Sequence, residues 1–146
     1  MGDLNNEIVL DGGMLAMAAH KGRGNCLAPT RTIHLGPGGG VLVPTAYMKS
    51  VQGYDGPQWY TIYAKITGPG SLTSNNNASP QIVIANPEND CSGGTWVVPQ
   101  EQPQWRVTPE GKLGTSPVLV ASECCLTMEG NANMSPKAWL ATIERT

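Results

Sequence analysis

Short runs of β-branched and aromatic residues recur along the chain, and glycine or proline separates most runs from the next. Runs of this kind are typical of short β-strands joined by turns. Helix-favouring composition occurs at 14–20, where flanking glycines limit any helix to a short one. The pattern therefore predicts an all-β domain with strands at 7–10, 40–43, 60–64, 81–84, 95–98, 105–107 and 118–120, and a weaker one at 138–141.

Three short units repeat in the same order along the sequence. The triplet Pro-Gln-Trp at 57–59 returns at 103–105, and a strand and a glycine turn follow each copy. The stretch 77–85 resembles 133–141, and Asn25-Cys26-Leu27 is echoed near Cys125. Units that recur across the whole length predict one domain, 1–146, built from three imperfect repeats at roughly 1–54, 55–100 and 101–146. Chance repetition in a chain rich in glycine and proline is the alternative.

Charge is scarce in this sequence. Charged residues make up 14% of the chain and the net charge is −2. Because no basic residues cluster, we expect no nucleic-acid partner. A surface with few charges is poorly protected against association, which suits a protein that packs against copies of itself or against another protein.

No apolar run approaches the roughly twenty residues that a membrane-spanning helix needs. The first seven residues are polar and acidic, and they lack the basic and apolar regions of a signal peptide. We therefore expect no membrane span and a protein that is cytoplasmic at synthesis, either part of a particle or exported by a non-classical route.

The residues that could support catalysis or bind a metal are few. The cysteines lack the CxxC spacing of a zinc ribbon, so buried free thiols are expected, with long-range disulfides or a metal site as alternatives. Neither histidine lies beside a nucleophile in sequence, and the carboxylates form no clear acid–base pair. We expect no enzyme activity, no metal and no cofactor. These cysteines and histidines are Cys26, Cys91, Cys124, Cys125, His20 and His34.

The last 45 residues of the sequence, and the rest more loosely, resemble a known family. Gln104-Trp105 opens a strand, a turn at 111–113 follows, and Cys125-Leu126 precedes a Gly/Asn loop and a short apolar run. This order resembles a repeat of the ricin B-type β-trefoil, best over 101–146. The resemblance implies a β-trefoil-like barrel that binds sugars. Sugar-binding repeats of that family carry an Asp after the Cys-Leu pair, where this chain has Ala28 and Thr127-Met128.

Candidate ligand-binding residues combine aromatic rings with amide or carboxylate groups. A ring covers the apolar face of a pyranose, while Asn and Asp bind its hydroxyls. The alternative is that the tryptophans belong to the core and the asparagines serve turns. The candidates are Tyr54, Asp55, Asn131, Asn133 and Trp139.

Two classes of function follow from these patterns. The first is a non-catalytic binding module that recognises a glycan. The second is a structural component of a larger assembly, such as a phage or virion decoration protein. The stretches 8–15 and 117–125 are also similar to PAAR-like spike-tip proteins of contractile injection systems. The expected partner is a glycan or a protein, with a homo-oligomer among the possibilities.

Overall fold

The computed structural model describes residues 3, 5–18, 23–45, 59–74, 81–97, 104–122 and 124–130. The described part is all-β and contains no helix, which confirms the predicted class. Its thirteen strands are β1 (Ile8–Leu10), β2 (Gly13–Ala18), β3 (Arg23–Cys26), β4 (Thr32–Leu35), β5 (Gly40–Thr45), β6 (Trp59–Ile62), β7 (Lys65–Thr67), β8 (Leu72–Ser74), β9 (Gln81–Ile84), β10 (Thr95–Val97), β11 (Gln104–Val107), β12 (Val118–Val120) and β13 (Cys125–Met128).

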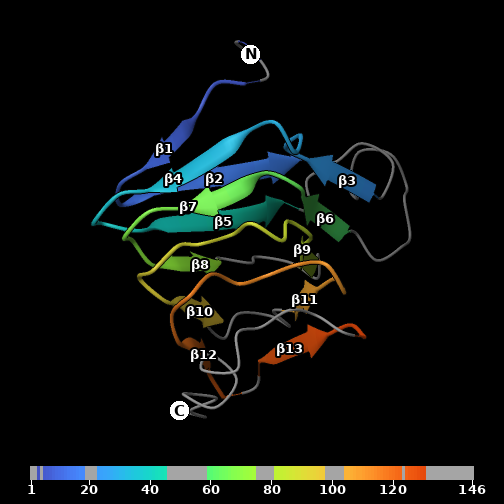
Figure 1. Cartoon of the computed structure of the whole chain (residues 1–146). Coiled ribbons are helices and arrows are strands. Elements are labelled where there is room, and N and C mark those ends of the chain that lie inside the picture. The colour runs from blue at the N-terminus through green and yellow to red at the C-terminus, as the bar shows by residue number, and fades with distance from the viewer. Residues whose placement is uncertain are drawn as a thin grey trace.

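The strands stack as a parallel β-solenoid with three sheets (Figure 1). Sheet A has the order β1-β4-β7, sheet B the order β12-β10-β8-β5-β2, and sheet C the order β13-β11-β9-β6-β3. Every pairing in these sheets is parallel. Each of the five described coils therefore contributes one strand to sheet B and one to sheet C, and the first three coils also contribute one to sheet A. In sheet B the residue number of the paired Leu72, Thr95 and Val118 rises by 23 per coil.

The expected β-trefoil-like barrel is wrong. A trefoil is built from antiparallel hairpins, whereas neighbouring strands here are successive coils joined by long parallel crossovers. The repeated Pro-Gln-Trp triplet spans two coils, and it does not align in register. Tyr60 pairs with Ile82, and Ile82 pairs with Trp105, so Trp59 is one position away from the place that Trp105 occupies. The physical repeat is the coil, not a third of the chain.

The short helix considered at 14–20 is also wrong, because Gly13–Ala18 forms β2. All six residues of β2 pair with β5, and this ladder outweighs the helix propensity of Met, Leu and Ala, which is a small preference in free energy. Met17 is buried and Leu15 is partly buried, while Met14 and Ala16 are exposed, which is the period-two alternation of a strand. Strands form in the seven other predicted stretches that the structure describes, and 138–141 lies outside the described residues.

The core is a set of inward-facing side chains stacked from coil to coil. Tyr60, Ile82 and Trp105 occupy one register position in sheet C and are all fully buried. The Trp105 indole N–H donates to Ser74 Oγ at 2.8 Å, which satisfies the polar atom of the largest core side chain. Leu10 and Leu35 stack in the same way in sheet A.

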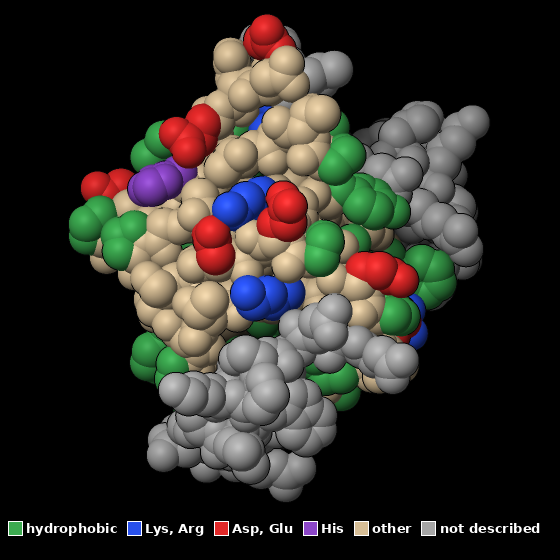
Figure 2. Space-filling model, viewed as in Figure 1, with side chains coloured by type: hydrophobic (Ala, Val, Ile, Leu, Met, Phe, Trp, Pro, Cys, Tyr) green, Lys and Arg blue, Asp and Glu red, His purple; other side chains and the backbone are tan. Residues whose placement is uncertain are grey.

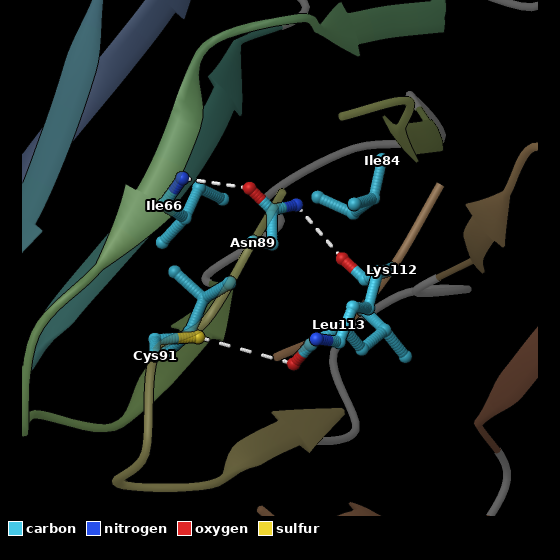
Figure 3. Close-up of a pocket in the computed structure, with 7 residues that line it drawn as sticks. Ile66, Ile84, Asn89, Cys91, Lys112 and Leu113 are labelled. Atoms are coloured by element: carbon cyan, nitrogen blue, oxygen red, sulfur yellow. Dashed lines mark hydrogen bonds between the residues drawn. The ribbon is translucent and has the colours of Figure 1, made fainter. Parts of the chain in front are cut away.

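Asparagine side chains continue the hydrogen-bond ladder where sheet A has no further regular strand (Figure 3). Asn89 Oδ1 accepts from Ile66 N at 2.7 Å, and its Nδ2 donates to Lys112 O at 2.7 Å. Asn86 Nδ2 donates to Tyr63 O at 2.7 Å. These two buried amides therefore connect three successive coils, and they leave few backbone groups of the corner without a partner.

Glycines form the corner between sheets A and B, because consecutive coils approach too closely there for a Cβ atom. A Cβ on Gly70 would lie 2.0 Å from Gly36 O, and one on Gly93 would lie 2.2 Å from Gly70 C. The glycine-rich stretch at 36–40 is thus a tightly stacked corner.

We expect Gly70→Ala to lower the free energy of unfolding by about 3 kcal/mol, because backbone atoms of the neighbouring coil must move. The matched control is Gly13→Ala, whose added Cβ has no atom within 4 Å, and we expect a change within about 0.5 kcal/mol. Urea denaturation followed by circular dichroism measures both. Equal effects of the two variants would contradict the stacked corner.

Cys91 lies in the same interior and is a buried free thiol that donates weakly to Leu113 O at 3.9 Å. Burial, helped by the Asp90 carboxylate, raises its pKa to about 11. Since the thiolate is the reactive form, we expect Cys91 to resist iodoacetamide at pH 8 while the exposed Cys125 reacts. Peptide mass spectrometry after brief alkylation checks this, with urea-unfolded protein as the control. Equal labelling of both cysteines in the folded protein would refute it.

Candidate functional site

The residues that the sequence singles out for ligand binding lie outside the described residues. They are Tyr54, Asp55, Asn131, Asn133 and Trp139. His20 also lies outside them. His34 is on the outer side of β4, where its Nδ1 lies 3.8 Å from Glu7 Oε1 and its register neighbours are Val9 and Thr67. Within the described part, no cluster of three or more metal-ligating side chains forms.

The outer surface of sheet A and the turns beside it carry charged and polar groups next to one exposed apolar residue, Val9, which is 61% exposed. Lys65 Nζ lies 2.8 Å from Asp90 Oδ2. The hydrogen bond from the Lys65 ammonium lowers the pKa of Asp90, and the same bond raises the pKa of Lys65. Figure 2 shows basic and acidic side chains side by side on this view of the molecule. Paired charges of this kind keep a surface hydrated.

The outer surface of sheet C also carries an ion pair. Arg106 Nε lies 2.7 Å from Glu129 Oε1, and both side chains are partly exposed. Val83 faces outward on β9, between Thr61 of β6 and Arg106 of β11, and is nevertheless buried. Polar groups therefore mark two of the three outer surfaces of the solenoid.

Sheet B differs from both, because none of its five strands contains a charged residue. The strand register places one outward residue of each coil beside the outward residue of the next coil, across the whole sheet. Met14 is 66% exposed and Trp96 is 45% exposed. We call the outward residues the sheet B face: Met14, Ala16, Val41, Val43, Thr73, Trp96 and Leu119.

The sheet B face offers little hydrogen-bonding capacity. Thr73 supplies the only hydroxyl among its seven residues, and Thr73 Oγ1 already donates to Trp96 O at 2.9 Å. Each outward residue spans about 4.8 Å across the strands and about 6.6 Å along them, so the seven residues form a patch of roughly 220 Å². Contiguous apolar patches that approach a few hundred Å² on a folded protein often have a function.

Two runs of consecutive apolar residues in the sequence indicate this apolar face. Val41-Leu42-Val43 and Val118-Leu119-Val120 are apolar at consecutive positions. A strand with one solvent-exposed face alternates apolar and polar residues, so consecutive apolar residues indicate that both faces of the strand are apolar. The sequence could not show that these runs stack in one sheet, because that depends on the coil register.

Hollows in the described part are shallow or very small. The interior gap around Asn89 and Cys91 has no room for a water molecule (Figure 3). An open hollow of about 460 Å³ is lined by Leu27, Ala28, Pro29 and Tyr63, without a charged side chain. The described residues include no helix long and apolar enough to cross a membrane.

Comparison with known proteins finds no relative of this chain. No protein-family model matches it, and neither a curated protein nor a solved structure does. These comparisons therefore neither support nor contradict a relationship to the ricin B-type family.

Proposed function

We propose that this protein is a non-catalytic structural component of a larger assembly, and that it docks onto a protein partner through the sheet B face. The observation that carries the proposal is the contrast between the outer surfaces of the solenoid. Ion pairs lie on sheets A and C, while sheet B presents exposed Met14 and Trp96 with no charge among its strands.

The chemistry of the face favours a protein over a glycan as the partner. Tryptophan and methionine are enriched at the centres of protein interfaces, where charged residues are depleted. A sugar needs hydrogen-bonding groups as well as an aromatic ring, and the one hydroxyl of this face is already engaged. The indole N–H of Trp96 is the remaining side-chain donor of the face, so a matching partner surface is apolar with one acceptor at this position.

Glycan recognition is the alternative function, and it depends on other residues. Its candidates, Tyr54, Asp55, Asn131, Asn133 and Trp139, do not belong to the sheet B face. The two functions therefore depend on different residues, and substitutions in each set distinguish them.

We expect the wild-type protein to sediment as an oligomer or particle, and Trp96→Ser to reduce that association about tenfold or more, because the exposed aromatic ring of the face is removed. Tyr63→Ser is the matched control, since Tyr63 is a similarly exposed aromatic residue outside the face, and its association should equal that of wild type. Sedimentation velocity over a concentration series measures both.

A glycan array on the same proteins completes the experiment. The structural proposal expects a blank array. A monomeric wild type that binds a glycan, and loses it in Asn131→Ala or Trp139→Ala, would replace the proposal with lectin-like function.

A further inference from the structure

The N-terminal end of the solenoid presents three strand edges. The strands β1, β2 and β3 each stand last in their sheets, at the end opposite to β12 and β13 (Figure 1). In a parallel ladder, alternate residues direct their N–H and C=O groups to opposite sides. Roughly half of the residues of β2 therefore direct these groups away from β5, where no described strand pairs with them.

Among these edges, β2 lacks the features that block strand pairing. Native edges are protected by lysine, proline, bulges or short length. The strand β2 is six residues long, contains no charge or proline, and pairs with β5 without a bulge from Gly13 to Ala18. By contrast, β1 has three residues between Glu7 and Asp11, and β3 begins with Arg23.

We propose that β2 pairs antiparallel with β2 of a second copy of this chain, across a twofold axis perpendicular to sheet B. This inference deepens the proposed assembly role, on which it rests, by naming the partner. The pairing joins two five-stranded sheets edge to edge and makes one continuous apolar face from two. A twofold contact uses the same strand on both copies, so the N–H and C=O groups that one β2 directs away from β5 meet those of the other.

Charge complementarity favours a second copy over an unrelated strand. The twofold axis places β1 of one copy over β3 of the other, because these strands lie at opposite ends of β2. Glu7 and Asp11 flank β1, where Asp11 Oδ1 accepts from Gly38 N at 2.6 Å, and Arg23 begins β3. The acidic flank of β1 in one copy therefore meets a strand that begins with a basic residue in the other, at two symmetric places.

The partial burial of core side chains at the N-terminal end of the solenoid also favours a second copy as the partner. Ile8 and Leu15 belong to the inward-packing set, yet they are only partly buried, and both lie in the first coil. A second copy stacked on the end would cover them. The sheet B face of roughly 220 Å² is smaller than the roughly 800 Å² that each partner of a stable complex buries, so a stable dimer needs an added contact such as this end.

The first test replaces outward residues of β2. In the antiparallel pair, Met14→Lys/Ala16→Lys places lysines opposite lysines, and we expect the dissociation constant of the dimer to rise about tenfold or more. The control Thr61→Lys/Thr67→Lys adds the same charge to outward, partly buried positions on sheets C and A and should leave dimerisation unchanged. Sedimentation equilibrium gives the constants, and circular dichroism confirms that both variants fold.

The second test uses charges that lie outside the sheet B face. Arg23→Glu should weaken the dimer, and Glu7→Lys added to it should restore the affinity, because the opposite charges are exchanged across the axis. Failure of this rescue, or equal dimerisation of Arg23→Glu and wild type, would overturn the twofold arrangement.

Hydrogen exchange of β2 amides separates this inference from the proposed function. If β2 amides gain protection as wild type dimerises, the edge pairing is supported even where Trp96→Ser has no effect. If Trp96→Ser disperses the assembly while β2 amides exchange equally in monomer and dimer, the face proposal stands and the edge pairing is refuted. A wild type that is monomeric at every concentration refutes both.

Discussion

The parallel hydrogen-bond ladder between successive coils is the constraint on which the rest of this structure depends. Each coil must return its strands to the register of the coil before it, as in the 23-residue steps through Leu72, Thr95 and Val118. Where the backbone leaves the ladder, the asparagine at 89 replaces strand groups with its own amide. Where coils meet most closely, glycine is required, since a Cβ on Gly70 would lie within 2.0 Å of a backbone oxygen.

This ladder also decides what each surface offers. Because side chains alternate across a strand and the register is preserved, an outward position in one coil lies beside the same position in the next. Outward residues of similar chemistry therefore stack from coil to coil and form a continuous row on one surface. Lys65 and Asp90 make an ion pair between coils on one side, whereas Val41, Trp96 and Leu119 lie on an uncharged sheet.

Among the described strands, the first of each sheet has a strand neighbour on one side only, as at the end of a solenoid. The strand β2 combines an open edge with membership of the uncharged sheet. Backbone pairing and apolar docking thus belong to one element of the fold. The low charge of the sequence indicates a tendency to associate, and β2 is where we expect that association to occur.

The sequence by itself determined the class of local structure: short apolar runs such as Val118-Leu119-Val120, broken by glycine and proline, form strands. Its repeats were misread, because the 46-residue spacing of Trp59 and Trp105 spans two coils, and pattern alone cannot choose between antiparallel hairpins and parallel coils. Helix propensity at 14–20 was overridden by the six-residue ladder to β5. Only the tertiary structure decided that Met14 and Trp96 share one face, because long-range register, not local preference, brings distant strands together.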